Sequence, residues 1–481
     1  MMDQTNSLSV EAALAGRRIL LTGSTGLFGK AVLNKVARAA PGPQRIYVLL
    51  RPRGRASAAE RFAGEVLGDD LFGGATAGAA GKGVVKSLLE RTVVVEGDVS
   101  RRDLGIRADW LARLRSDVDL IINCAGTIRF HAPLVEAFPV NSLGPSRLAE
   151  FADGCERQVS IVHVSTCFAA AARDGVIMES GGENAESTGG GRRVHALREC
   201  RAALGLDGGP VAPVEGTDHG FRIAREYGWI DTYTLTKALG EHLLQRNTLR
   251  SRVVVFRPSI LLCTLQDPTP GWMDRRQFFQ CVARRWCRGN LRRLRGDPRA
   301  VLDIVPLDLA VNALLVSFAD AQEAARSFTV YQFASGAANR ITVSEFIEHM
   351  DQWRRQWRTR VPSPVRGSNH DAHDCRIHAA AAVAAGGDRF DHPDDTRGME
   401  WDPDVSTPDR ARREQLHRAI ERIYEPYARL HCRFSSGRLQ TAWKRLRWGE
   451  RDRYCCDVKR VNWNTFLRNV YFESLMGNRQ S

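Results

Sequence analysis

The sequence lacks any run of about 18 or more apolar residues, the length that a helix needs to cross a bilayer. It also lacks a secretory signal, because the stretch from Met1 to Ser9 is polar and has no basic start followed by an apolar core. None of its 11 cysteines lies in Cys-x-x-Cys spacing, which argues against a disulfide framework. We therefore expect a cytoplasmic protein with reduced thiols.

Signatures of nucleic-acid binding are missing as well, since neither zinc-finger spacing nor an RNA-binding aromatic motif accompanies the net charge of +14. Much of this charge is arginine, and the arginine-rich stretch 284–299 has Asp297 as its only acid. Such a stretch is either a solvated basic surface or a surface that attracts phosphates, an acidic carrier protein or an anionic membrane. We expect no nucleic acid as a partner, and an anionic membrane only as a peripheral contact.

What the sequence does contain is the alternation of a parallel α/β fold. A chain of 481 residues with 43% hydrophobic and 26% charged residues can bury a large core and is long enough for two or three domains. Short apolar runs separated by helical stretches are typical of a parallel sheet that is covered on both faces. They predict the α/β class with a Rossmann-type doubly wound parallel sheet. The expected strands are Arg17–Thr22, Ile46–Leu50, Thr92–Glu96, Leu120–Asn123, Ser160–Val164 and Arg252–Arg257.

The pattern changes between and after these strands. Two Gly- and Ala-rich pieces, near 68–83 and 180–210, are predicted to be loop insertions. A helix is expected from about Thr342, and a polar low-complexity stretch follows it at 363–396. The last segment is predicted to be helical and to pack as a small second domain over the substrate side of the sheet. The expected organisation is a Rossmann-type domain at 1–340, a helix and linker at 341–404, and a helical C-terminal domain at 405–481.

The first predicted strand ends in a glycine-rich turn, Thr22-Gly23-Ser24-Thr25-Gly26-Leu27-Phe28-Gly29. Glycines at this spacing permit a tight strand-to-helix turn, and they let backbone N–H groups reach a pyrophosphate at the positive end of the helix. A glycine triplet is a weak signal by itself, but here a strand precedes it and an amphipathic helix follows it. The turn therefore predicts a dinucleotide site.

The end of the second strand indicates which dinucleotide binds. NAD sites usually place an acid there for the ribose 2′-hydroxyl, whereas NADP sites place an arginine near the 2′-phosphate. Here Arg51 follows the strand and no acid occurs before Glu60, so we expect NADPH as the cofactor. Two later strand ends are expected to line the same site, namely Asp98-Val99 and Asn123-Cys124-Ala125-Gly126.

Tyr233 and Lys237 form a Tyr-x-x-x-Lys motif, which places the two side chains one helical turn apart on the same face. An ammonium near a phenol lowers the pKa of the phenol and eases proton delivery to an oxygen that becomes an alkoxide as hydride arrives. The lysine can also hold the nicotinamide ribose. Downstream of the glycine-rich turn and just before the sixth strand, this motif predicts a reductase.

A third polar partner is expected at the end of the fifth strand, in His163-Val164-Ser165-Thr166. A hydroxyl there would donate to the carbonyl oxygen of the substrate as one arm of an oxyanion site. Strand alternation sends Ser165 and Thr166 to opposite faces, so only one of them can serve. Thr166 is preferred because it lies nearer the carboxyl end, and Ser165 is the alternative. His163 is interpreted as a packed sheet residue.

Two other chemistries have candidate residues in the sequence. A cysteine acyl-enzyme would use Cys167 or Cys124, but neither cysteine has an obvious base or positive field beside it, so both are interpreted as packed residues. The His- and Cys-containing stretch 370–378 has the residue types of a metal site. It lies in the low-complexity segment, where such clustering arises by accident, so no metal site is predicted.

With these motifs in order, the sequence resembles the alcohol-forming fatty acyl-CoA reductases, a branch of the extended short-chain dehydrogenase/reductase superfamily. The resemblance runs through most of the chain, and its most discriminating pieces are Thr127-Ile-Arg-Phe130 and Asp303-Ile-Val-Pro306. The segment from Cys456 to Trp463 is similar to the second domain of that family. The other matching pieces are Thr22–Gly29, Ile46–Arg51, Gly97-Asp98, Val140-Asn141, Gly144, His163–Thr166, Tyr233–Lys237, Arg257–Ile260, Gly271-Trp272 and Asp308.

The resemblance implies reduction of a long-chain fatty acyl thioester by NADPH, through the aldehyde to a primary fatty alcohol, with the acyl chain carried by CoA or an acyl carrier protein. It implies that Tyr233 and Thr166 steady the oxyanion in both reductions, with no metal or covalent nucleophile. It also implies that Asn141 positions Lys237 through water. The further cofactor contacts that it implies are Pro258, Ser259 and Ile260.

The sequence also departs from this family. The family commonly has a tyrosine where Phe168 stands, the segment 180–228 has no counterpart that we can place, and Pro145 is unusual inside a helix. These departures concern the shape of the acyl pocket rather than the chemistry.

Three alternative functions remain open. A thioester reductase that stops at the aldehyde would keep every residue named above, and product analysis alone separates it from an alcohol-forming enzyme. A sugar-nucleotide epimerase or sterol dehydrogenase would have no reason to carry the segment from Cys456 to Trp463. A non-catalytic NADPH-binding regulator would not need the complete set of tyrosine, lysine and hydroxyl.

Overall fold

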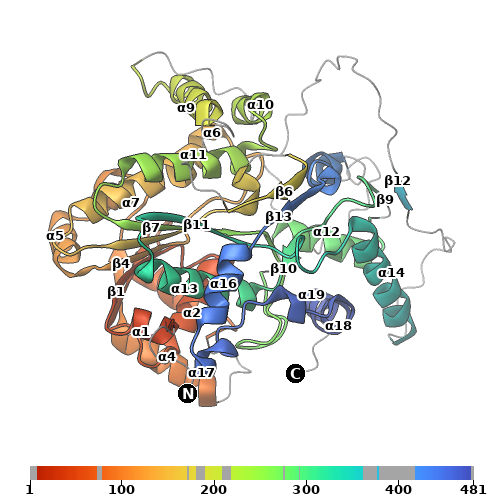
Figure 1. Ribbon diagram of the computed structural model, residues 1–481, viewed down its shortest axis with the longest axis horizontal. Helices are drawn as coiled ribbons and strands as arrows, with labels where there is room; N and C mark the ends of the chain where they lie inside the picture. Colours follow the sequence, from red (N-terminus) through yellow and green to blue (C-terminus); the bar gives the residue numbers. More distant parts are fainter. Residues whose placement is uncertain are drawn as a thin grey trace.

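The computed structural model describes residues 8–72, 79–170, 173–179, 190–208, 218–274, 277–291, 293–360, 376–378 and 418–477. Within them, seven strands form one parallel sheet in the order β11-β7-β5-β4-β1-β2-β3, and helices cover both of its faces (Figure 1). This is the doubly wound Rossmann-type arrangement that the sequence predicts. The strands of the sheet are β1 (Arg18–Thr22), β2 (Arg45–Leu50), β3 (Thr92–Glu96), β4 (Leu120–Asn123), β5 (Ser160–Val164), β7 (Arg252–Pro258) and β11 (Phe328–Phe333).

Short strand pairs and many helices surround this sheet. The paired strands are β6 (Gly175–Ile177) with β13 (Cys432–Phe434), β8 (Ile260–Leu261) with β10 (Ile304–Val305), and β9 (Arg293–Arg295) with β12 (Arg376–His378). The helices of the first half are α1 (Val10–Leu14), α2 (Leu27–Ala37), α3 (Ala58–Arg61), η2 (Phe62–Leu67), α4 (Ala79–Arg91), η3 (Arg102–Gly105), α5 (Ala108–Asp117), α6 (Leu134–Phe138), η4 (Pro139–Leu143), α7 (Gly144–Asp153), η5 (Cys167–Ala170), α9 (Gly190–Ala203), α10 (Asp218–Glu226) and α11 (Thr232–Asn247). Those of the second half are α12 (Phe278–Cys287), α13 (Leu307–Glu323), α14 (Val343–Arg360), η7 (Tyr427–Arg429), α16 (Gly437–Arg445), α17 (Trp448–Arg451), η8 (Val458–Arg460), α18 (Trp463–Phe466), η9 (Leu467–Tyr471) and α19 (Phe472–Met476).

Consecutive side chains of the central strands pack against opposite faces of the sheet. Leu21 and Val48 belong to an apolar cluster with helices α2 and α13, whereas Leu20 and Tyr47 belong to a second cluster with α5 and α7. Because both faces are covered, the strands are apolar at nearly every position, as in parallel sheets generally. Their carboxyl ends meet at one edge of the sheet, where ligands of this fold bind.

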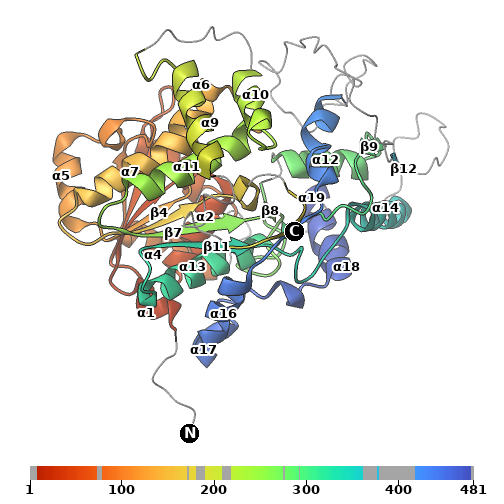
Figure 2. The ribbon, with the colours of Figure 1, turned by 45° about the horizontal axis from the view of Figure 1, so that its top comes forward.

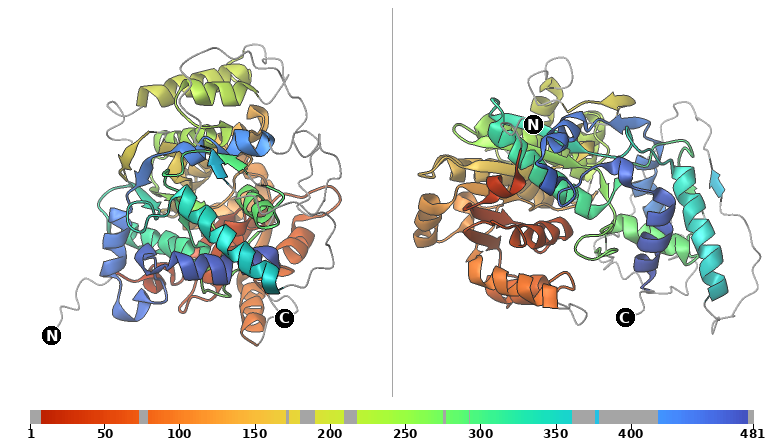
Figure 3. Two further views of the ribbon diagram at one scale, coloured as in Figure 1. Left: turned by 90° about the vertical axis from the view of Figure 1, so that its right-hand side faces the viewer. Right: turned by 60° about the horizontal axis from the view of Figure 1, so that its bottom comes forward.

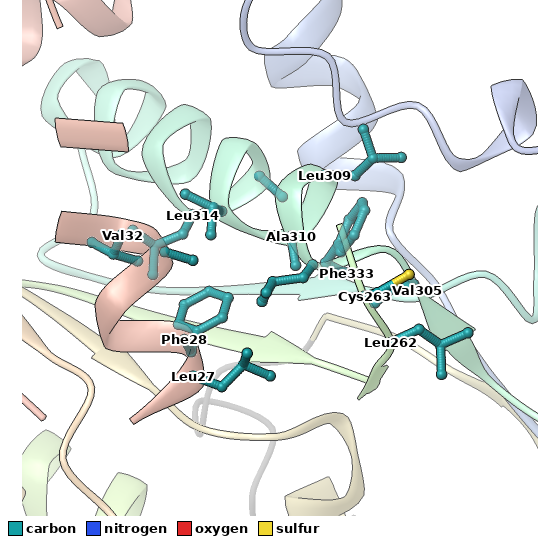
Figure 4. Packing of buried hydrophobic residues seen from close by; sticks show 14 of the residues in the cluster. Leu27, Phe28, Val32, Leu262, Cys263, Val305, Leu309, Ala310, Leu314 and Phe333 are labelled. Carbon is teal, nitrogen blue, oxygen red and sulfur yellow. The ribbon is translucent and has the colours of Figure 1, made fainter. Parts of the chain in front are cut away.

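Helices α2 and α13 pack against each other on one face of the sheet. Figure 4 shows Phe28 and Val32 of α2 lying toward Ala310 and Leu314 of α13. Phe28 also stacks on Phe256 of β7, with ring centroids 6.1 Å apart. Burial of a side chain of this size contributes about 1.5–3 kcal/mol, so the first turn of α2 is firmly fixed behind the glycine-rich turn.

The expected loop near 180–210 is wrong in part, because helix α9 occupies residues 190–203. Its buried Ala196 and Cys200 are four residues apart and pack with Ile223 of α10 and Leu239 of α11. Figure 2 shows α9 and α10 together beside α11. The Gly- and Ala-rich composition concealed this helix, since small residues supply little periodic apolar signal.

Other expectations about the connecting segments have mixed outcomes. The helix expected near Thr342 is α14, which confirms that prediction. In the expected loop near 68–83, residues 73–78 lie outside the described residues and α4 begins at Ala79. The low-complexity stretch at 363–396, with its His- and Cys-containing cluster, lies outside the described residues apart from 376–378. In the described part of the chain, no helix is both long and apolar enough to cross a membrane.

The C-terminal segment, described from residue 418, packs mainly against helices α12, α13 and α14. Buried Leu439 of α16 and Phe472 of α19 belong to the same apolar cluster as α2 and α13. Figure 3 shows α14 beside the C-terminal helices, and the rings of Trp353 and Phe472 lie 6.0 Å apart. Strand β13, by contrast, pairs with β6. The domain boundaries expected from the sequence stay predictions.

Candidate active site

The glycine-rich turn has the backbone shape that a pyrophosphate requires. Gly23 has φ +73°, and a Cβ at this position would lie 2.4 Å from the backbone carbon of Cys124. A Cβ at Gly29 would lie 2.1 Å from the Gly23 carbonyl oxygen, so neither position accepts a side chain. Gly26 caps α2 without a side-chain hydrogen bond, which leaves the first N–H groups of the helix open to an anion. The residues present therefore fit a dinucleotide, and the buried hydroxyl of Ser24 has no partner among the described residues.

A buried polar network holds the floor of this site. Thr22 Oγ1 donates to Asn123 Oδ1 at 2.6 Å and accepts from the Ala125 N–H at 3.2 Å. The Asn123 amide lies 3.0 Å from His163 Nδ1. Burial, aided by the nearby Lys237 ammonium, lowers the pKa of His163 to about 3. His163 is therefore a neutral packed residue, as expected, and it orders the strand end from Asn123 onward.

Arg51 is available at the end of β2. Its side chain is 65% exposed, and its guanidinium lies 3.8 Å from Asp98 Oδ2. The backbone carbonyl of Arg51 accepts from Arg61 at 2.7 Å, so the main chain is fixed while the guanidinium stays at the surface. Asp98 also accepts from the Ser100 N–H at 2.8 Å, which orients the carboxylate at the end of β3. The two predicted cofactor residues Arg51 and Asp98 thus lie together.

The other predicted cofactor positions are held by the backbone. Val99 is buried against Gly144, where an added Cβ would lie 3.3 Å from its side chain. The Ser259 N–H donates to the Phe333 carbonyl at 3.0 Å, and the Ile260 N–H donates to the Asp303 carbonyl at 3.2 Å. Thus the turn after Pro258, the end of β7, is tied to two further segments at the same edge of the sheet. The roles of these residues stay predictions.

Helix α11 brings the tyrosine and lysine of the motif to this edge. Asp231 caps the helix, because its Oδ1 accepts from the Thr234 N–H at 2.8 Å. One turn after Tyr233, the Lys237 ammonium donates to the Val164 carbonyl at 2.9 Å. A Cβ at Gly126 would lie 2.9 Å from Lys237 Nζ, so the lysine contacts the floor of the cofactor site. The motif and the glycine-rich turn therefore share one site.

The two candidate hydroxyls point in different directions. Thr166 lies beside Tyr233, and its hydroxyl lowers the pKa of that phenol. Ser165 instead donates to Glu241 Oε1 at 2.5 Å, and Glu241 is held by Arg257 at 2.8 Å in a buried ion pair. The structure thus brings Thr166, and not Ser165, to Tyr233. Ser165 is a structural hydroxyl here, because it is hydrogen-bonded to the buried Glu241–Arg257 ion pair.

Burial sets the protonation states of the central residues. It lowers the pKa of Lys237 to about 8. The pKa of Tyr233 is raised, mainly by burial and further by the charge of Asp231, while the Thr166 hydroxyl lowers it. These effects oppose the lowering that the Lys237 ammonium was expected to produce. Tyr233 therefore holds its proton at neutral pH and is suited to donate it.

Asn141 lies in the π-helix η4, where the chain bulges next to α11. Its Oδ1 accepts from the Thr127 N–H at 2.9 Å, and its amide donates to the Thr127 carbonyl at 3.0 Å and to Thr236 Oγ1 at 3.1 Å. Pro145 follows in the first turn of α7 and has no N–H to donate, which favours the wider turn before it. The unusual proline is thus part of the geometry that presents Asn141.

Neither cysteine near the site is activated. Burial raises the pKa of Cys124 to about 12, although the Lys237 ammonium opposes this rise. Burial also raises the pKa of Cys167, whose thiol donates to the Arg257 carbonyl at 3.0 Å. A thiolate nucleophile would need the opposite shift, so the acyl-enzyme alternative has no support here.

The basic stretch 284–299 is only partly exposed. Arg284 is buried, whereas Arg299 is 88% exposed and lies 3.5 Å from Asp297. Arg295 is 61% exposed and lies 3.8 Å from Glu421. Two of its cations therefore have acidic neighbours, which reduces the field that the stretch presents to a partner.

Sequence reasoning missed two residues of this site, Asp231 and Glu241. Asp231 could have been found as a helix cap, because it stands three residues before Thr234 at the start of an apolar helix. Glu241 lies one turn after Lys237 in helix α11, whereas its buried partner Arg257 lies in strand β7. No local pattern in the sequence predicts the ion pair between Glu241 and Arg257.

Known proteins resemble this chain in sequence and in fold. Residues 21–314 match the NAD-binding family model described as Male sterility protein. The alcohol-forming fatty acyl-CoA reductase of Simmondsia chinensis is 30% identical, over 71% of this chain and 71% of its own length. The chloroplastic fatty acyl-CoA reductase 2 of Arabidopsis thaliana is 28% identical, over 99% of this chain and 80% of its own length.

A solved structure shares the whole fold. The terminal R domain of the myxalamid PKS-NRPS pathway superposes with a TM-score of 0.62 at 17% identity, covering 100% of this chain and 96% of that domain. The family model matches more than half of the chain, and together with these relatives it shows the family. The chain therefore belongs to the fatty acyl-CoA reductase family, in the extended short-chain dehydrogenase/reductase superfamily, and is an oxidoreductase with a nicotinamide cofactor site.

Proposed function

We propose that this reductase uses NADPH to reduce a long-chain fatty acyl thioester, held on CoA or an acyl carrier protein, through the aldehyde to a primary alcohol. The observation that carries the proposal is the meeting of Thr166, Tyr233 and Lys237 at the strand ends beside the glycine-rich turn. The printed activities of the two relatives support the substrate class, since both are fatty acyl-CoA reductases and the Simmondsia protein is alcohol-forming.

In the first reduction, negative charge develops on the thioester oxygen, and hydrogen-bond donors stabilise it. The nicotinamide cofactor supplies the hydride when it is bound. The Thr166 hydroxyl lies beside the Tyr233 phenol, so a substrate oxygen placed against both can accept one hydrogen bond from each. Breakage of the carbon–sulfur bond then releases the thiol and leaves an aldehyde in contact with the same two donors.

In the second reduction, the aldehyde oxygen must gain a proton to become the alcohol, and Tyr233 holds that proton. Lys237 and Asn141 flank Gly126, where an added Cβ would lie 2.9 Å from Lys237 Nζ and 3.2 Å from Asn141 Oδ1. A water molecule between those atoms would connect the lysine to Asn141 and return a proton to the tyrosine. The charged lysine also favours the phenolate that forms for a moment.

The test is the palmitoyl-CoA-dependent oxidation of NADPH by the purified protein and by Tyr233→Phe. We expect Tyr233→Phe to lower the rate by about 10³-fold, because it removes both a proton donor and an oxyanion contact. NADPH binding, measured by fluorescence, should stay within about twofold, since the ring remains.

Tyr227→Phe is the matched control. Tyr227 directly follows α10, and its hydroxyl donates to Glu199 at a distance of 2.5 Å instead of contacting Thr166 or Lys237. It should keep the activity of the unaltered protein. A Tyr233→Phe variant as active as Tyr227→Phe would remove Tyr233 as the proton donor.

A further inference from the structure

The C-terminal segment reaches the start of the catalytic helix through Tyr427 of η7. Its hydroxyl donates to Asp231 Oδ2 at 2.7 Å, across 196 positions of sequence. Strand β13 follows Tyr427 directly and pairs with β6, with Phe434 opposite Ile177 (Figure 1). This backbone pairing fixes the segment, so the hydroxyl is held in place rather than carried on a free loop.

Aromatic rings connect Tyr427 to the catalytic tyrosine. The Tyr427 ring meets Phe168 edge-on at 5.2 Å and Phe130 at 5.4 Å. Phe130 in turn meets the Tyr233 ring at 5.9 Å and 82°, and its carbonyl accepts from the Tyr233 N–H at 3.3 Å. Phe130 therefore contacts both tyrosines, and a displacement of Tyr427 would reach Tyr233 through it.

Asp231 receives hydrogen bonds from both sides. Its carboxylate is 1% exposed; one oxygen accepts from the Thr234 N–H and the other from Tyr427. Burial raises the pKa of Asp231 to about 6, and the hydrogen bonds from Thr234 and Tyr427 oppose this rise. The charge of Asp231 in turn raises the pKa of Tyr427 in η7 and of Tyr233 in α11.

We propose that Tyr427 is a positioning residue for the reduction: by donating to Asp231 it orients the helix cap, and thereby holds Tyr233 beside Thr166. This inference rests on the proposed reductase activity. It gives the C-terminal segment a task in the active site, in addition to packing against helices α12, α13 and α14. The cap can position the tyrosine because Asp231 is the N-cap of α11 and Tyr233 is the second residue of that helix.

The test compares Tyr427→Phe with Tyr424→Phe in palmitoyl-CoA-dependent NADPH oxidation. Tyr424 is a buried tyrosine one turn earlier in the same segment, and its hydroxyl has no hydrogen bond among the described residues. We expect Tyr427→Phe to lower kcat by about tenfold with little change in KM, because a hydrogen bond to a charged group is lost. Tyr424→Phe should keep the kcat of the unaltered protein.

A pH profile separates positioning from support of the fold. Loss of a donor to the carboxylate raises the pKa of Asp231, so the acid limb of kcat should move from about pH 6 to higher pH in Tyr427→Phe. In the Asp231→Asn background, which cannot ionise, Tyr427→Phe should lower kcat by less than about twofold further. An unmoved acid limb, or full additivity of the two substitutions, would overturn the proposal. If the unaltered protein fails to oxidise NADPH with palmitoyl-CoA, the proposed function itself fails, which is a distinguishable result.

Discussion

The proposed preference for NADPH over NADH rests on Arg51. In this proposal, its exposed guanidinium at the end of β2 pairs with the ribose 2′-phosphate, a contact that NADH cannot make. We expect Arg51→Ala to raise KM for NADPH by about 10- to 100-fold and to leave KM for NADH unchanged. Steady-state kinetics with both cofactors measure this.

Arg45 provides the matched control. It is the first residue of β2, at the opposite end of the strand from Arg51. Arg45→Ala should leave both KM values as they are. An equal rise in KM for NADPH and for NADH in Arg51→Ala would show that the arginine does not bind the 2′-phosphate.

Lys237 sets the alkaline limit of activity. Burial lowers its pKa to about 8, so its ammonium is present below pH 8 and disappears as the pH rises through that value. Because the proposed chemistry uses the charged form, kcat should fall above about pH 8. Lys237→Arg keeps a charge throughout this range, so its weaker activity should show no such decline. A pH-rate profile of both proteins measures the effect, and a flat profile of the unaltered protein from pH 7 to pH 10 would refute it.

At the scale of elements, helix α11 and the π-helix η4 touch at Gly240. A Cβ at this position would lie 2.1 Å from the Asn141 carbonyl oxygen, so Gly240→Ala must push the two helices apart. A shift of about 1 Å in catalytic groups costs about 10²-fold in rate, and we expect a loss of kcat of that order. The free energy of unfolding, measured in urea, should fall by about 1–3 kcal/mol.

Gly83→Ala is the control for this substitution. Gly83 lies in α4, and an added Cβ would have no atom within 4 Å. It should keep full activity and gain up to about 1 kcal/mol of stability, because alanine favours a helix. A Gly240→Ala variant with full activity would mean that the spacing of α11 and η4 does not matter for the chemistry.

For the molecule as a whole, the sheet follows from local patterns. Each strand is a short apolar run, and parallel strands place their carboxyl ends at one edge. Thr22, Asn123 and Thr166 could therefore be assigned to one site before their distances were known. The tyrosine and lysine follow from helix geometry alone, since residues four apart share a face.

Contacts between distant segments could not be predicted in this way. Tyr427 meets Asp231 only because the chain returns after α14 and pairs β13 with β6, and no periodicity encodes that return. The raised pKa of Tyr233 likewise depends on burial by several elements together. The choice of Thr166 over Ser165 required the position of Glu241, which the strand pattern does not contain.

The proposed alcohol-forming reaction requires two hydrides for each acyl group. The measurement is the ratio of NADPH oxidised to CoA released from palmitoyl-CoA by the purified protein, with the products identified by mass spectrometry. We predict two NADPH per CoA and formation of the C16 primary alcohol, because the same pair of hydroxyls serves both reductions. One NADPH per CoA with free aldehyde as the final product would contradict the alcohol-forming reaction.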